Sequence, residues 1–131
     1  MIYLLDTNIC IFASKKNHPI VEILKKKSSD DLRISSITLA EIYYGVQKSI
    51  RKLENELYCD EFFSQFEILD FDRAAAKEYG LIRTHLERSG QMIGERDCQI
   101  ASIARANKLA VVTNNIREFV RVPDLIIENW S

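Results

Sequence analysis

Four acidic side chains from well-separated parts of the chain are the residues best suited to act together in catalysis: Asp6, Glu41, Asp97 and Glu118. Asp97 gives the clearest signal, because its predicted helix places it on one face with Ile100, Ala101 and Ala104. An aspartate on an apolar face is rarely buried unless it is paired or bound to a metal ion. A cluster of such acids repels itself unless a cation neutralises it, and an all-oxygen donor set favours Mg²⁺ or Mn²⁺.

Each acid also has a simpler structural explanation. Asp6, within Asp-Thr-Asn, is a good N-cap for the helix that follows it. Asp97 lies in a first helical turn, where the helix dipole favours a negative charge. The two glutamates each follow a capping residue by three positions, as in a capping box; the pairs are Thr38 with Glu41 and Asn115 with Glu118. The combination of the four residues, rather than any one of them, indicates a metal centre.

Other catalytic chemistries lack their residues. The two histidines have unrelated contexts, since His18 falls in a predicted loop and His85 on a predicted helix surface, which disfavours zinc. The three cysteines have no metal-binding spacing and fit reduced thiols: Cys10, Cys59 and Cys98. The chain has no glycine-rich phosphate loop and no nucleophile elbow.

Short apolar runs that alternate with helical patterns must position these acids. The pattern predicts strands at 2–5, 32–35, 67–69, 109–113 and, more weakly, 125–127. It predicts helices at 8–14, 19–27, 52–66 and 95–107, and a loop over 15–19. Two further helices have identifiable caps: one runs from a cap at Ser36 or Thr38 to residue 49, and the other from a cap at Asp72 to residue 88, with Gly90 as its stop. This alternation is typical of an α/β fold with a central parallel sheet of four to five short strands flanked by helices.

The predicted sheet would bring several polar residues to one edge. Asp6 follows the first strand, and the run Thr113-Asn114-Asn115 follows the fourth. Ligands of open parallel sheets bind outside the carboxyl ends of the strands. We therefore expect the candidate site at this edge.

Length and composition exclude several classes of protein. The 131 residues predict one domain spanning 1–131, and 47% hydrophobic residues suffice for a core. The net charge of −1 gives no strongly basic surface for nucleic acid. No apolar run reaches the 18 or so residues of a membrane span, and the first residues lack the basic region of a signal peptide. We expect a cytoplasmic protein without membrane attachment.

Five stretches, in this order along the chain, make the sequence resemble the PIN-domain ribonucleases, and specifically the VapC toxins of bacterial toxin–antitoxin pairs: 5–12, 34–45, 93–101, 112–119 and 127–130. The first stretch begins with Leu-Asp-Thr-Asn, and the last stretch is Ile-Glu-Asn-Trp. The likeness covers essentially the whole chain. It implies a PIN-like fold and a Mg²⁺- or Mn²⁺-dependent endoribonuclease that leaves a 5′-phosphate and a 3′-hydroxyl.

The resemblance assigns roles to individual residues. Asp6, Glu41 and Asp97 fall on the family's acidic catalytic positions. Many PIN domains have a fourth carboxylate near Asn115, but here that residue is an amide and Glu118 follows one helical turn later. Glu118 is expected to take the role, directly or through a water. Residues expected to orient the acids are Asn8 and Thr113, with Asn115 beside them.

The resemblance also implies partners. We expect an RNA substrate, namely initiator tRNA cut in its anticodon loop, and inhibition by a VapB-like antitoxin that inserts a basic side chain, most simply Arg, into the acidic cluster. A homodimer and a larger assembly with operator DNA, bound through the antitoxin, are expected too. Without the four acids, the rest of the chain has a net positive charge. Four basic residues near the acids in sequence are candidates for binding the RNA backbone: Lys48, Arg51, Arg96 and Arg117. Each of them is alternatively an ordinary surface residue.

Two other functions compete with this interpretation. A Mg²⁺-dependent phosphatase on a doubly wound sheet would normally have a second Asp two residues after Asp6, where this chain has Asn8. An inactive PIN scaffold that only binds a partner would not require Asp6, Glu41 and Asp97 together.

Overall fold

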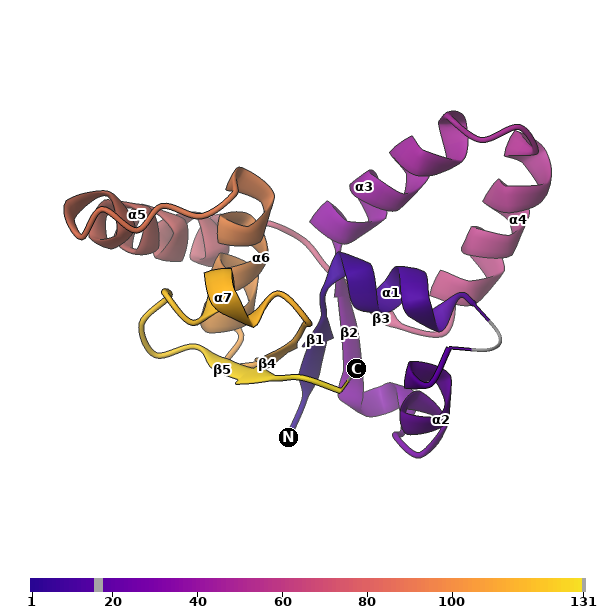
Figure 1. Cartoon of the computed structure of the whole chain (residues 1–131), viewed down its shortest axis with the longest axis horizontal. Helices are drawn as coiled ribbons and strands as arrows, with labels where there is room; N and C mark the ends of the chain where they lie inside the picture. Colours follow the sequence, from indigo (N-terminus) through magenta and orange to yellow (C-terminus); the bar gives the residue numbers. More distant parts are fainter. Residues whose placement is uncertain (16–17, 131) are drawn as a thin grey trace.

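A computed structural model describes residues 1–15 and 18–130 and contains a parallel β-sheet flanked by helices (Figure 1). The predicted α/β class is confirmed. The strands are β1 (Tyr3–Leu5), β2 (Leu32–Ser35), β3 (Glu67–Leu69), β4 (Ala110–Val112) and β5 (Ile126–Glu128), in the spatial order β3-β2-β1-β4-β5.

The strand order creates a switch point beside the central strand. The chain passes from β1 outward to β2 and β3, and then returns to add β4 and β5 on the other side of β1. Leu5 of β1 pairs with Val112 of β4 in parallel register. Asp6 and Thr113 therefore leave the sheet next to each other, at the place where open α/β sheets bind ligands.

Alternating side chains of β1 pack into two separate hydrophobic cores. Leu4 packs with residues of α5 (Arg73–Arg88) and α6 (Glu95–Ala106), whereas Leu5 packs with residues of α1 (Thr7–Ala13) and α2 (Ile20–Lys25). This alternation follows from the pleat of a strand that is covered on both faces. The central strand, and the acid that ends it, are thus fixed from both sides.

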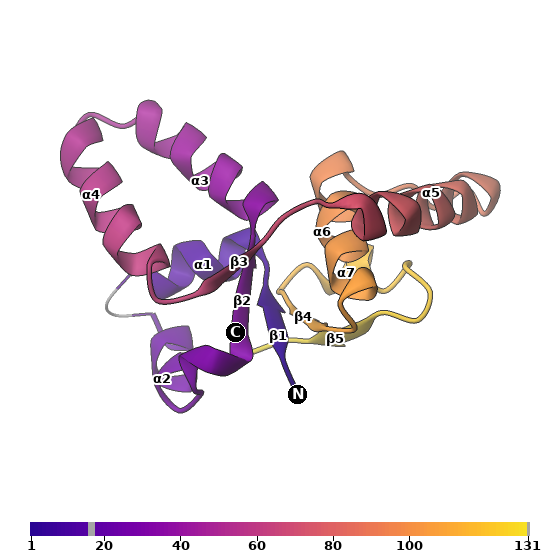
Figure 2. The same cartoon turned by 180° about the vertical axis from the view of Figure 1, so that it is seen from behind.

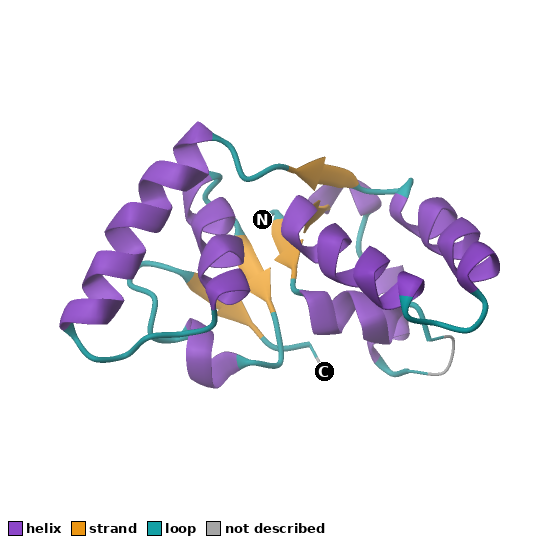
Figure 3. Ribbon diagram, turned by 90° about the horizontal axis from the view of Figure 1, so that it is seen from above, coloured by secondary structure: helices purple, strands orange, loops and turns teal. Residues whose placement is uncertain are grey.

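The remaining helices flank the site. They are α3 (Ser36–Gln47), α4 (Lys52–Phe63) and the short α7 (Ile116–Phe119). Helices α3 and α4 form a hairpin that extends from one end of the sheet, and α5 extends in the opposite direction (Figures 1 and 2). Seen from above, the helices form two groups, α1–α4 and α5–α7, with strands between them (Figure 3).

Most of the differences from the predicted elements lie at their ends. The cap of α3 is Ser35, whose hydroxyl accepts from the backbone N–H of Thr38, rather than Ser36 or Thr38. Helix α4 ends at Phe63, three residues before the predicted end, and β5 lies one residue later than predicted. Gly90 ends α5 as predicted, with a φ of 67°. A 3₁₀ turn (Ser29–Asp31) and α7 were not predicted.

Lys16 and Asn17 of the predicted loop 15–19 lie outside the described residues. Among residues 1–15 and 18–130, no helix has both the length and the apolar character needed to cross a membrane.

Candidate active site

Asp6 is buried at the carboxyl end of β1 with both of its carboxylate oxygens bonded. Its Oδ1 accepts the backbone N–H of Thr7 at 2.8 Å, and its Oδ2 accepts the hydroxyl of Thr113 at 2.7 Å. Burial raises the pKa of Asp6, the two hydrogen bonds oppose that rise, and the charges of Glu41 and Glu118 add to it. Asp6 therefore caps α1, as its structural explanation requires, and it also feels the charges of two other acids. Its catalytic role is still a prediction.

Thr113 connects β4 to the polar residues after it. While its hydroxyl donates to Asp6, the same oxygen accepts the backbone N–H of Asn115 at 2.9 Å. The side chain is fully buried. Thr113 therefore holds Asp6 and the start of the segment that contains Asn115 in place.

A chain of hydroxyl groups orients Glu41, which lies in α3. Thr7 donates to Glu41 Oε1 at 2.9 Å, and Thr7 and Thr38 hydroxyls lie 3.0 Å apart. Ser35 donates to Thr38 at 3.2 Å. Because each hydroxyl has only one proton, these bonds run in one direction, from Ser35 through Thr38 and Thr7 to Glu41.

This arrangement overturns the capping box suggested for Glu41. Thr38 lies inside α3 rather than at its cap, and the carboxylate reaches across to Thr7 instead of back to its own helix. Sequence reasoning missed Thr7, Ser35 and this role of Thr38. The available signal was the position of Thr7 directly after Asp6, in Asp-Thr-Asn.

Asn115 joins the other two acids. Its amide nitrogen donates to Asp97 Oδ2 at 3.2 Å and to Glu118 Oε2 at 2.9 Å. An amide nitrogen has two protons, so one Asn satisfies both carboxylates. The side chain of Asn115 makes no capping bond to α7, which removes the capping-box explanation for Glu118.

Asp97 is the third residue of α6 and lies on the apolar face that the sequence predicted. Its neighbours on that face, Ile100, Ala101 and Ala104, are fully buried. Burial, followed by the effect of Glu118 and then the charge of Asp6, raises the pKa of Asp97 to about 8. The pKa of Glu118 is lowered, chiefly by its bonds with Asp97 and Asn115. The pair thus retains one proton near neutral pH, because two adjacent carboxylates do not ionise together easily.

A cation would replace this proton and relieve the repulsion. Within the described part of the chain, no three His, Cys, Asp or Glu side chains are placed to enclose an ion directly. Mg²⁺ does not need such a cage, because it usually binds one or two carboxylates and keeps several waters. The donor chemistry and the excess negative charge at the switch point therefore fit a hydrated divalent cation.

The structure separates the other candidate residues into two groups. Arg96 lies next to Asp97, with its Nη1 3.8 Å from Glu41 Oε2, and Arg117 is close enough to lower the pKa of Glu118. Lys48 and Arg51, however, lie at the far end of the α3–α4 hairpin, where Arg51 pairs with Glu54 at 3.4 Å.

Asn8 is exposed on α1, and none of the described side chains forms a hydrogen bond with its amide. The expected orienting role of Asn8 is therefore still a prediction.

Comparison with known proteins places this geometry in a family. The sequence pattern of the PIN domain matches residues 3–125. Ribonuclease VapC2 of Rickettsia felis is 49% identical over 100% of this chain and 99% of its own length. The chain belongs to the VapC ribonucleases of the PIN-domain family. This membership makes it a nuclease of a metal-dependent family and agrees with the acidic cluster at the switch point.

Other VapC relatives extend the likeness. The tRNA(fMet)-specific endonuclease VapC of Shigella flexneri is 43% identical over 98% of both chains. The toxin chain in the crystal structure of DNA-bound VapBC from Salmonella typhimurium superimposes with a TM-score of 0.93, at 42% identity, over 100% of this chain and 99% of that one. The resemblance inferred from the sequence is confirmed.

Proposed function

We propose that this chain is a Mg²⁺- or Mn²⁺-dependent endoribonuclease, the cytoplasmic toxin of a toxin–antitoxin pair, and that residues 1–131 form one PIN domain. Asp6, Glu41, Asp97 and Glu118 are its proposed catalytic acids. The observation that carries the proposal is the bridge from Asn115 to Asp97 and Glu118, at the switch point where Asp6 ends β1. Family membership adds independent support.

The proposed mechanism divides the work among these residues. A bound divalent cation would supply a water of lowered pKa and offset the charge on the scissile phosphate. Asp6 and Asp97 are the best placed to hold it, because hydrogen bonds from Thr113 and Asn115 fix their carboxylates. Glu41 and Glu118 would act directly or through water, and Thr7 orients Glu41.

Two arginines are placed to meet the RNA backbone close to the acids. Arg96 and Arg117 flank the cluster from α6 and α7. Lys48 follows Glu41 on α3 by about two helical turns, and the rise of an α-helix makes this about 10 Å. Lys48 and Arg51 would therefore contact phosphates farther from the cleaved bond. Such contacts position a substrate without reading its sequence.

We propose initiator tRNA, cut in the anticodon loop, as the substrate. The names of the Shigella and Salmonella relatives specify tRNA(fMet). A loop suits this site, because unstacked nucleotides can be splayed out toward the acids while a duplex holds its phosphates in a fixed helix.

Purified protein incubated with total bacterial RNA and Mg²⁺ should therefore give one dominant new 5′-phosphate end, in that loop. Mapping of all new ends checks this. Cuts scattered over messenger RNA, or concentrated in ribosomal RNA, with initiator tRNA intact, would refute the substrate and leave the nuclease proposal standing.

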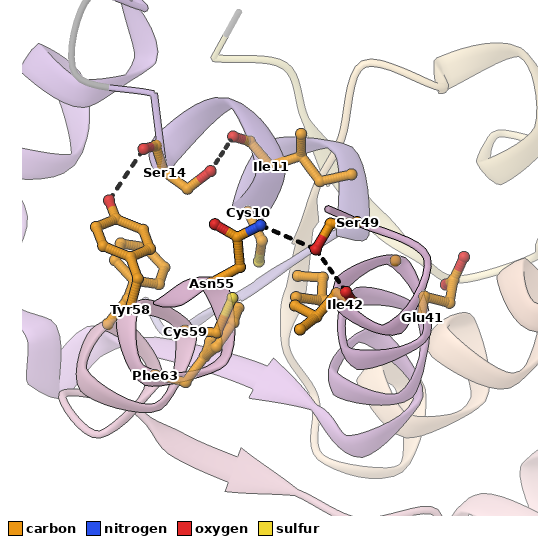
Figure 4. Close-up of a pocket in the computed structure, with 13 residues that line it drawn as sticks. Cys10, Ile11, Ser14, Glu41, Ile42, Ser49, Asn55, Tyr58, Cys59 and Phe63 are labelled. Carbon is orange, nitrogen blue, oxygen red and sulfur yellow. Dashed lines mark hydrogen bonds between the residues drawn. The ribbon is translucent and has the colours of Figure 1, made fainter. Parts of the chain in front are cut away.

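The inhibitor is proposed to be a VapB-like antitoxin, as in the VapBC complexes with DNA that relatives form. An apolar cavity of about 470 Å³ lies between α1, α3 and α4 (Figure 4). Cys10, Ile42 and Phe63 line it, and Glu41 lies at its edge. Apolar side chains of an antitoxin tail would fill this cavity, which lets a following Arg reach the acids. A homodimer and operator binding through the antitoxin complete the proposed assembly.

The fourth acid can be tested separately. If Glu118 helps to hold the cation, Glu118→Gln should raise the Mg²⁺ concentration for half-maximal cleavage by about tenfold, as losses near a metal often do. Asn115→Ala removes only an orienting amide and should raise it less. Mg²⁺ titrations of tRNA cleavage compare the two variants, and a larger effect of Asn115→Ala would reject Glu118 as the fourth acid.

A further inference from the structure

Arg96 occupies a position that the proposed catalytic roles do not explain. Its Nη1 lies 3.8 Å from Glu41 Oε2, across the gap between α6 and α3. Arg96, Glu41 and Asp97 line the same open hollow, of about 650 Å³. Among the ion pairs of residues 1–15 and 18–130, this is the only one that joins a basic side chain to an acid of the cluster.

The contact is suited to exchange rather than to support of the fold. The side chain of Arg96 is 64% exposed and that of Glu41 is 25% exposed, so the mobile partner of the pair is the solvated arginine. An ion pair of this length with such an exposed partner contributes little to stability. Arg105 provides a contrast, since it pairs with Glu78 at 3.0 Å and is only 18% exposed. Oε1 of Glu41 is held by Thr7, so the oxygen that faces Arg96 is the one free to change its partner.

We propose that Arg96 is an exchangeable counter-ion of the active site. In the metal-free protein it neutralises Glu41; when a divalent cation occupies the cluster, Arg96 is repelled, leaves Glu41 and binds an RNA phosphate next to the cleaved bond. A guanidinium serves both partners, because its planar donor fork matches carboxylate and phosphate alike. This inference rests on the proposed function and adds a link between metal binding and RNA binding.

The first test measures metal affinity without RNA. Titration of Mn²⁺, with the free ion followed by electron paramagnetic resonance, should give a dissociation constant about two- to fivefold lower for Arg96→Gln than for wild type, since a competing nearby cation is lost. Arg88→Gln is the matched control, because Arg88 is exposed and is the last residue of α5. An Arg96→Gln affinity that equals or falls below that of wild type would overturn the proposal.

The second test asks whether Glu41 restrains Arg96. In chelator, initiator tRNA binding is measured for wild type, Glu41→Gln, Arg96→Gln and the double variant. Glu41→Gln removes a negative charge and should therefore strengthen tRNA binding whether residue 96 is Arg or Gln. The gain should be about threefold larger when Arg96 is present to be released, because adjacent residues couple in a double-mutant cycle. Equal gains in the two backgrounds would contradict the restraint.

The two proposals fail in different ways. The Mn²⁺ titration contains no RNA, so a wrong substrate leaves its result intact. Conversely, correct cleavage of initiator tRNA with unchanged Mn²⁺ affinity in Arg96→Gln would reject the role of Arg96 alone.

Discussion

Asp97→Asn is expected to reduce RNA cleavage by about a hundredfold to a thousandfold while the protein stays folded, the range seen when a group that stabilises transition-state charge is removed. The amide keeps the shape of the side chain but loses the charge that would hold a cation. Asp6→Asn should abolish cleavage as well, but it has a structural cost. Asp6 accepts two hydrogen bonds, one on each oxygen, and an amide has one oxygen.

Circular dichroism and initial cleavage rates of initiator tRNA check this prediction. Asp31→Asn, on the exposed 3₁₀ turn, is the matched control, and its rate should equal that of wild type. A cleavage rate close to wild type for Asp97→Asn, at low Mg²⁺, would show that the acid has no part in the chemistry.

The second large effect concerns stability without metal. Asp97 has a raised pKa of about 8 in the folded protein against 3.8 for an ordinary Asp, so the folded state binds a proton that the unfolded state lacks between these values. Stability in chelator should therefore fall as pH rises from about 4 to about 8. At pH 9, Asp97→Asn should be more stable than wild type by on the order of 1–2 kcal/mol, or about 3–6 °C in Tm.

Added Mg²⁺ should reverse the order, because a ligand that binds only the folded state stabilises it, and wild type binds more tightly. Thermal melts of wild type and Asp97→Asn across pH, each in chelator and each with Mg²⁺, give the four melting temperatures to be compared at every pH. A wild type that melts above Asp97→Asn in chelator at pH 9 would mean that Asp97 is structurally satisfied without a cation.

Local patterns were enough to predict the sheet and the positions of Asp6 and Asp97 in the fold. The apolar runs at 2–5 and 109–113 have the composition of strands buried on both faces, and β1 and β4 formed there. The spacing of Ile100, Ala101 and Ala104 put Asp97 on a buried face, which the structure confirms. The parallel pairing of β1 with β4 then brought Asp6 and Thr113 together.

Interactions between distant segments could not be predicted in this way. The hydroxyl chain from Ser35 to Glu41 depends on how α1 packs against α3, which no local pattern encodes. The same limit applies to Asn115, because its bridge to Asp97 spans two segments, whereas the local spacing suggested a capping box. Nearness in sequence also grouped Arg51 with Arg96, although only Arg96 contacts an acid of the cluster.

The most direct test of the account is a single titration of metal into stripped protein, in which Mn²⁺ binding and cleavage of initiator tRNA are measured on the same samples. We expect no cleavage in chelator, a cleavage rate that rises in proportion to bound Mn²⁺, and the loss of both binding and cleavage in Asp97→Asn. Cleavage that persists in chelator, or Mn²⁺ binding that Asp97→Asn leaves unchanged, would contradict the assignment of the acidic cluster as the catalytic metal site.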